Sequence, residues 1–412
     1  MSSNIRPLLT IVIATKNREI YCIEAIKSIL SINSDKIEIA IADNSDSSKV
    51  KIFVESLNNE HLKYIYDSSP TSSIANFNRA MSLATGTYVC MIGDDDGINP
   101  DIIEVTAWAL DNDVDAVFGS MSANYRWEGT GAPDTLFTKM TGSTLTITPF
   151  NGKAEIVDIN QSLERFMKNG CTNYADYKLP RLYHGLVKRK FFDILKSETG
   201  DYLKGLSPDI YSSLALAFKI KKLVFLDYPI TIPGVCGVST SVIEGQKKSN
   251  SKKIEHIPHL KNRGDYSWSK YVPRFYCVQT IWADSGFAAI KEFGREDLIQ
   301  RFNRRSLYAK ILNADLSLIS YLYKHIVDDC KSNSRFVSIE IMLTFLSYIK
   351  VFVKRNIFFR AYNRFCTKLR LKRMDTLTGL VEITQAMNAL TDNISQRQID
   401  YRHNLAKVEN KI

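Results

Sequence analysis

The sequence lacks the features that mark secreted, disulfide-linked or membrane-spanning proteins. Its seven cysteines are scattered over 412 residues, and none of them stands in a Cys-x-x-Cys spacing. No stretch reaches ~18 uninterrupted apolar residues, and the N-terminus has no apolar signal core. We therefore expect a cytoplasmic protein with reduced cysteines that spans no membrane.

Basic residues are in excess, but the excess is local. The formal net charge is +10, and residues 350–373 alone hold nine Lys and Arg and no acid. Residues 1–100 hold nine basic residues against twelve acidic ones. A general nucleic-acid footprint would be spread more widely, so we expect anionic partners other than nucleic acid.

Short apolar runs alternate with helical patterns over the first 120 residues. This alternation is typical of a doubly wound α/β sheet. The predicted strands are residues 8–14, 37–42, 62–66, 88–92 and 114–118. Residues 120–160 suggest a loop-heavy insertion, and everything beyond Tyr271 suggests helix. We predict a catalytic domain over 1–240, a basic loop or linker over 241–270 and a helical C-terminal region over 271–412.

Three consecutive carboxylates, Asp94 to Asp96, directly follow the predicted strand 88–92 and lie between Gly93 and Gly97. Thr15 and Asp43 likewise end their own strands. In doubly wound sheets, ligands bind outside the carboxyl ends of the strands. The pattern predicts a divalent cation with an anionic ligand at this edge; the alternative is a solvated acidic turn before a helix.

Four segments together resemble the family 2 glycosyltransferases, whose nucleotide-sugar-binding fold is called GT-A. They are residues 10–18, 41–45, 78–86 and 93–100. The resemblance covers residues 7–235 and implies that Thr15, Asn17, Arg18 and Asp43 contact the nucleotide. It further implies that Arg79 lies near the diphosphate. Gly93 stands where the family often has a first acid.

The resemblance also implies roles for the acidic residues. Asp94 and Asp96 would hold Mn²⁺ or Mg²⁺, with Asp94 and Asp95 also meeting the nucleotide sugar. An inverting transferase needs a general base for the acceptor hydroxyl. Asp209, in Ser-Pro-Asp at a predicted helix start, is the candidate, and Asp201 is the alternative. Without a base role, Asp209 would be an acid favoured by the helix dipole.

Four further residues are weaker candidates for contacts with the acceptor or the diphosphate. They are Arg181, His184, His256 and His259. A lone histidine is more often structural than functional. The lysines just before His256 suggest a solvated loop that could close over the donor.

The C-terminal region contains two patterns of its own. Residues 345–374 predict a basic amphipathic helix, which would lie on an anionic membrane or pack on the protein. Residues 376–400 show near-heptad apolar spacing, which predicts a coiled coil or homodimer contact.

The family resemblance implies a metal-dependent inverting glycosyltransferase on the cytoplasmic face of a membrane. It would transfer one sugar from a nucleotide-diphosphate donor, for which a UDP-sugar is the first choice, to a glycan or lipid-linked glycan. The reaction would belong to surface polysaccharide assembly. Ala123 breaks the Gln-x-x-Arg-Trp motif of processive members, so polymer extrusion is not expected. Two alternatives stay open: a nucleotidyltransferase on a similar sheet, and a non-catalytic scaffold with the same fold.

Overall fold

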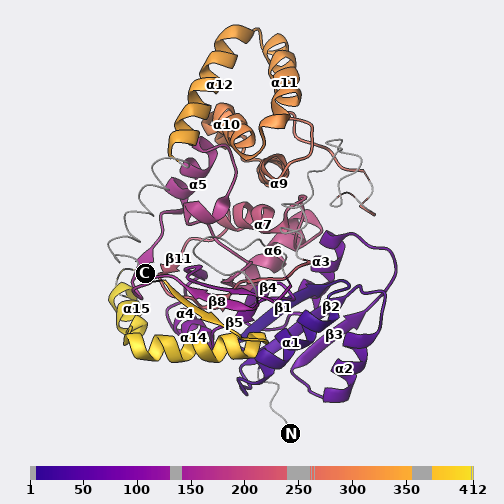
Figure 1. Ribbon diagram of the computed structural model, residues 1–412, viewed down its shortest axis with the longest axis vertical. Helices are drawn as coiled ribbons and strands as arrows, with labels where there is room; N and C mark the ends of the chain where they lie inside the picture. The colour runs from indigo at the N-terminus through magenta and orange to yellow at the C-terminus, as the bar shows by residue number, and fades with distance from the viewer. Residues whose placement is uncertain are drawn as a thin grey trace.

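The structure is a computed structural model that describes residues 6–129, 142–238, 260, 262–263, 265–354, 374–409 and 411. A mixed sheet with strand order β3-β2-β1-β4-β10-β6-β11-β9 forms its centre. Helices cover both faces of this sheet, and a helical hairpin projects from one end (Figure 1). The predicted α/β class with a helical C-terminal region is confirmed.

The first half of the sheet is parallel and holds the strands of the predicted crevice. β1 lies between β2 and β4, and Thr15 is in register with Asp43. Five apolar residues in a row, with no polar alternation, suit β4 to a position buried on both faces. The elements are β1 (Leu9–Thr15), α1 (Glu19–Leu30), β2 (Ile37–Asp43), α2 (Lys49–Leu57), β3 (Leu62–Tyr66), α3 (Ser73–Leu83) and β4 (Tyr88–Ile92).

The second half of the sheet is mixed because β10 runs antiparallel to both β4 and β6. β11 continues parallel to β6, and β9 closes the edge in the antiparallel direction. The elements are α4 (Ile102–Asp111), β6 (Ala116–Gly119), β9 (Ala154–Ile156), α5 (Ile159–Lys168), η1 (Tyr174–Tyr177), β10 (Gly185–Lys188), α6 (Arg189–Thr199), α7 (Pro208–Ala217) and β11 (Leu223–Leu226).

Two apolar cores lie on opposite faces of the sheet. One contains the side chains of Val12 and Ala40 with those of α3, α5, α6 and α7. The other contains Ile11 and Ile13 with α1, α2 and α4. The alternation of neighbouring residues between two cores is what a strand covered on both faces requires.

The predicted loop-heavy insertion over 120–160 is wrong in part, because two strands lie in it besides β9. β7 (Ala123–Arg126) and β8 (Thr144–Ile147) join β13 (Gly234–Val235) and β14 (Asp375–Thr378) in a four-stranded sheet. β12 (Thr231–Ile232) pairs with β5 (Gly97–Ile98) beside the acidic turn. Short strands whose partners lie far along the chain leave little local pattern to recognise.

The helical region begins with α9 (Val278–Glu292), which packs against α7. It continues through η4 (Glu296–Arg301), α10 (Arg304–Ala314) and η5 (Leu316–Leu318). α11 (Ile319–Ser332) and α12 (Val337–Phe352) then form the antiparallel hairpin at the top of Figure 1. No helix in the described parts of the chain is long and apolar enough to cross a membrane.

β14 then joins the four-stranded sheet, so the expectation of helix throughout beyond Tyr271 is wrong there. The predicted coiled coil over 376–400 is wrong as well. β14 pairs with β8, and α14 (Ile383–Arg397) lies along the bottom of Figure 1 against α1. The residues with heptad spacing, Ile383, Met387, Leu390 and Ile394, are buried in the core around β1. α15 (Tyr401–Glu409) follows. An apolar stripe has the same spacing whether it meets a second chain or its own domain.

Candidate active site

The acidic stretch is a buried turn at the carboxyl end of β4. The backbone N–H of Asp96 donates to the Gly93 carbonyl at 3.3 Å, and the three carboxylates are 2 to 5% exposed. This rules out the solvated acidic turn. A Cβ on Gly93 would lie 2.9 Å from an Asp96 carboxylate oxygen and 3.0 Å from the Tyr183 hydroxyl. Glycine is therefore the residue that lets the acids fold back over the strand end.

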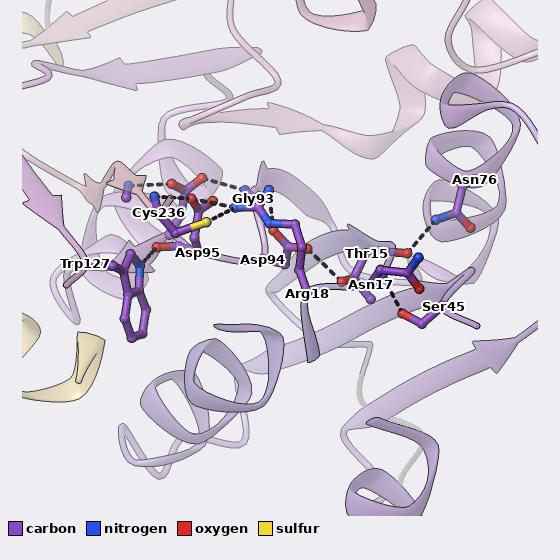
Figure 2. A network of polar contacts seen from close by, with 12 residues as sticks. Thr15, Asn17, Arg18, Ser45, Asn76, Gly93, Asp94, Asp95, Trp127 and Cys236 are labelled. Atoms are coloured by element: carbon purple, nitrogen blue, oxygen red, sulfur yellow. Dashed lines mark hydrogen bonds and ion pairs between the residues drawn. The ribbon is translucent and has the colours of Figure 1, made fainter. Parts of the chain in front are cut away.

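Two residues at the end of β1 meet this turn. Thr15 Oγ1 donates to Asp94 Oδ2 at 2.7 Å. Arg18 pairs through Nη1 with Asp94 at 2.9 Å and through Nη2 with Asp95 at 2.6 Å. Figure 2 shows Arg18 reaching across from its own loop toward the turn. Predicted residues on two neighbouring strand ends thus converge, as the crevice argument requires.

A second segment, near residue 235, clamps the turn from the other side. The Gly234 N–H donates to Asp96, and the Cys236 N–H donates to Asp95 at 3.1 Å. The indole N–H of Trp127 donates to the Asp95 carbonyl at 2.8 Å. Sequence reasoning assigned these three residues no role, because their partners are more than thirty residues away.

His184 belongs to the same cluster. Its Nε2 lies 3.3 Å from Asp96 Oδ2, and its Nδ1 lies 3.1 Å from the Thr231 hydroxyl. Burial, with a smaller contribution from Arg181, lowers the pKa of His184 to about 3. The imidazole is therefore neutral at physiological pH, and a neutral ring suits its bonds to a hydroxyl and a buried carboxyl.

The carboxylates resist ionisation in this setting. Burial raises the pKa of Asp94 to about 7, against the opposing effect of Arg18. Burial and the neighbouring Asp95 raise the pKa of Asp96 well above its ordinary value. Burial lowers the pKa of Arg18, but the two carboxylates outweigh it and hold the guanidinium charged. A strongly perturbed cluster of this kind is a mark of functional sites.

The side chains as arranged do not fit a resident divalent cation. The guanidinium of Arg18 takes up the oxygens of Asp94 and Asp95. Both Asp96 oxygens accept backbone N–H bonds, from Gly93 and Gly234. Within the described residues, no group of three or more His, Cys, Asp or Glu side chains could hold a metal ion. The prediction of Mn²⁺ or Mg²⁺ at Asp94 and Asp96 stays a prediction that would require Arg18 to move.

The predicted nucleotide side of the crevice lies beyond Thr15. Asp43 is fully buried, and its oxygens accept from the Ser45 N–H and the Tyr64 hydroxyl, both at 2.8 Å. Asn17 has φ +55 and bonds Asp46 through its side-chain amide. These contacts fix the segments that follow β1 and β2.

Two more residues frame this side. Asn76 Nδ2 donates to the backbone carbonyls of Thr15 and Ala42 and so ties β1 to β2; it was missed from the sequence. Arg79 pairs with Asp67 at 2.8 Å, and its side chain is about one quarter exposed. The structure therefore places Arg79 beside Asp67 and gives it no contact with the acidic turn among the described residues.

The proposed base lies in another group. Asp209 is in the first turn of α7 and accepts a hydrogen bond from the Ser207 hydroxyl. Burial raises the pKa of Tyr174, the charge of Asp209 raises it further, and the charge of Arg181 opposes both. Asp201, the alternative base, is exposed.

Arg181 is a buried cation. It is 6% exposed, donates to the Ala175 carbonyl at 2.6 Å and stacks over Phe118 at 4.7 Å. No carboxylate of the described residues forms an ion pair with it, and burial lowers its pKa. Such a guanidinium is suited to an anionic ligand. His256 and His259 lie outside the described residues.

Residues 10–162 match the family model described as Glycosyl transferase family 2. This part of the chain is similar to glycosyl transferase family 2. The match spans β1, the acidic turn and β7, which confirms the family resemblance. WcaA of Escherichia coli (strain K12), whose name describes a colanic acid biosynthesis glycosyl transferase, is 34% identical over 101 residues. That alignment covers 24% of this chain and 36% of the length of WcaA.

Solved structures are similar to this chain only at low identity and low TM-score. S. aureus TarS 1–349 in complex with UDP-GlcNAc is 14% identical, covering 80% of this chain and 92% of its own, with a TM-score of 0.42. The mannosyltransferase PcManGT from Pyrobaculum calidifontis, in complex with GDP-Man and Mn²⁺, is 12% identical. It covers 84% of this chain and 88% of its own, with a TM-score of 0.37. At these scores we base no argument on them.

Proposed function

We propose that this protein is an inverting glycosyltransferase that moves one sugar from a nucleotide-diphosphate donor to a glycan acceptor. One observation supports this above the others: the buried turn of Asp94 to Asp96, joined to Thr15 and Arg18, at the strand ends of a family 2 domain. A scaffold protein would have no need to hold three buried carboxylates against their own repulsion.

The donor nucleotide would lie along the ends of β1 and β2. Asn17 and Asp43 lie at these strand ends, and Arg18 lies between them and the acidic turn. The family resemblance favours a UDP-sugar and places Arg79 near the diphosphate. Arg79 would have to leave its partly exposed ion pair with Asp67.

The transfer itself is a direct displacement. The acceptor oxygen forms a bond to the anomeric carbon while the bond from that carbon to the diphosphate breaks, and the nucleoside diphosphate leaves with the electron pair. The acceptor proton passes to the Asp209 carboxylate, which Ser207 orients. Arg181, a buried guanidinium, would stabilise negative charge on a ligand. No step is assigned to a metal ion, because Arg18 occupies the carboxylates.

The acceptor proposed from the family resemblance is a lipid-linked glycan of surface polysaccharide assembly at the cytoplasmic face of a membrane. The basic stretch that suggested membrane contact, 345–374, is described only up to Lys354.

A donor screen tests the proposal. Purified protein would be incubated with UDP-, GDP- and dTDP-sugars, with Mn²⁺ or with EDTA, and hydrolysis and the melting temperature recorded. We expect one nucleotide class to raise the melting temperature, since a ligand at a hundred times its Kd stabilises by about 2.7 kcal/mol. Absence of any response across all donors, metal included, would sink the proposal.

A further inference from the structure

Helix α12 buries two polar residues and exposes most of its large apolar ones. The fully buried residues of this helix are Glu340 and Thr344. A helix on a water-soluble protein normally buries its apolar stripe and exposes its polar face. The exposed large side chains of α12 are Ile339, Ile341, Met342, Phe345, Leu346, Ile349 and Phe352.

Ion pairs fix this orientation. Arg305 on α10 forms a two-pronged pair with Glu340 at 3.0 and 2.9 Å, and Arg335 approaches the same carboxylate at 3.3 Å. If α12 turned to bury its apolar stripe, the buried carboxylate of Glu340 would lose both arginine partners, which would destabilise the protein. The outward apolar face is therefore built into the packing of α10 and α12.

The apolar surface continues over the rest of the hairpin. Phe336, in the turn between α11 and α12, is 76% exposed, and Phe345 and Leu346 are 57% and 54% exposed. On the η5–α11 side, Leu316, Ile319, Tyr321 and Tyr323 are exposed as well. We name the exposed apolar side chains of residues 316–352 the hairpin face. Figure 1 shows the hairpin projecting from the end of the molecule opposite α14.

Positive charge borders the hairpin face. Arg305, Lys350 and Asn303 line a hollow together with Leu343, Leu346 and Ser347, so cations and apolar side chains share one depression. The chain that continues from α12 is also basic, since residues 350–373 hold nine Lys and Arg and no acid. A patch that joins exposed aliphatic groups, tyrosines and cations has the composition of an interfacial membrane surface.

We propose that the hairpin face docks on an anionic lipid surface, with its apolar side chains among the acyl chains and its basic border at the headgroups. A second copy of this chain is the rival occupant. A two-fold contact through this face would bring like charges of two chains together, since Lys350 lies at the border of the face. Repulsion disfavours that contact, whereas an anionic leaflet attracts the same charge.

This inference rests on the proposed function in one respect, because a lipid-linked acceptor would place the substrate at that surface. The binding itself requires no sugar transfer. Vesicle binding and donor hydrolysis are therefore measured separately, and the failure of one does not imply the failure of the other.

The test is co-sedimentation of the full chain with phosphatidylcholine vesicles that contain or lack phosphatidylglycerol. We expect binding to the anionic vesicles that weakens with added salt. The double variant F345E/L346E should bind them at least roughly tenfold more weakly, because each introduced carboxylate is repelled and resists burial in lipid. The matched control is I52E, which changes a 63% exposed isoleucine on α2, away from the hairpin.

Three results would overturn the proposal. The first is a wild-type protein that does not co-sediment with the anionic vesicles. Equal vesicle binding by F345E/L346E and wild type would show that the face is not the contact. The third is a wild-type dimer in light scattering that becomes a monomer in F345E/L346E, while the wild type does not bind vesicles. This result would assign the face to a second copy. Circular dichroism of each variant establishes that it is folded.

Discussion

Arg18, from the loop after β1, and Asp94, from the turn after β4, form an ion pair of 2.9 Å. The same guanidinium reaches Asp95 at 2.6 Å, so one side chain neutralises two members of the acidic turn. A divalent cation bound by these carboxylates would compete with Arg18 for the same oxygens. The position of this side chain therefore governs whether a metal can enter.

Replacement of Arg18 by glutamine should make the protein more responsive to Mn²⁺. Without the guanidinium, Asp94 and Asp95 lose their cation, so the melting temperature should fall in EDTA. Added Mn²⁺ should then raise it by more than it does in the wild type. Differential scanning fluorimetry with a Mn²⁺ titration measures both effects.

The matched control is R295Q, which removes an exposed two-pronged pair with Asp297 away from the site. Its Mn²⁺ response should equal that of the wild type. If R18Q and wild type respond to Mn²⁺ alike, Arg18 does not occupy the cation position.

Gly234 should tolerate alanine less well than Gly93. A Cβ at Gly234 would lie 1.7 Å from the Asp95 backbone carbonyl, which cannot swing aside. At Gly93 the nearest atoms are side-chain oxygens at 2.9 and 3.0 Å, which can shift. We expect G93A to cost about 1–3 kcal/mol and G234A more. Urea unfolding of both variants checks this order, and the reverse order would contradict the described approach of β13 to the turn.

Asp284 should make stability depend on pH. Burial raises its pKa from 3.8 to about 6, against hydrogen bonds from the Ser269 N–H and the Tyr266 hydroxyl. Because the folded pKa exceeds the unfolded one, the stabilising contribution is complete below about pH 4 and is lost as pH rises through 6. Because the two pKa values differ by about two pH units, the unfolding free energy should fall by roughly 3 kcal/mol.

Urea unfolding of wild type and D284N between pH 4 and 8 measures this contribution. The difference in unfolding free energy between the two proteins should change most between pH 4 and 6 and level off above. The exposed D297N serves as control and should not reproduce that change. A constant difference across the range would show that Asp284 ionises as an ordinary carboxyl.

Leu390 tests the correction made to the C-terminal region. It is fully buried on α14 in the core around β1. L390A should cost about 2–5 kcal/mol and leave the oligomeric state unchanged. V381A, at a position 62% exposed just before α14, should cost little. Size-exclusion chromatography with light scattering measures the oligomeric state, and urea unfolding measures the stability. If L390A lost self-association without losing stability, the coiled-coil prediction would be correct after all.

The sequence was sufficient where a pattern is local. The strands Leu62–Tyr66 and Tyr88–Ile92 have the predicted bounds, because a strand pattern is visible within a few neighbouring residues. The convergence of Thr15 with the acidic turn also followed, since parallel strands end at one edge.

The rest depended on contacts that sequence does not display. Trp127, Gly234 and Cys236 hold the turn from elements far along the chain, and Asn76 ties β1 to β2 from α3. Nothing in the neighbourhood of these residues in the sequence marks their partners. The stripe on α14 had the correct spacing but was given the wrong partner, because periodicity shows that a face is buried and not against what.

Asp209 gives the most direct test of the reaction. D209N should keep donor binding and lose turnover by about 10²–10⁴-fold, because an amide cannot accept the proton of the acceptor hydroxyl. The Ser207 hydroxyl can still donate to the amide oxygen, so the start of α7 should stay folded. D201N, at the exposed alternative base, separates the two candidates. Initial-rate kinetics with the donor identified in the screen, and its Kd by calorimetry, are the measurements. Equal turnover by D209N and wild type would remove Asp209 from the mechanism, and a loss confined to D201N would move the base there.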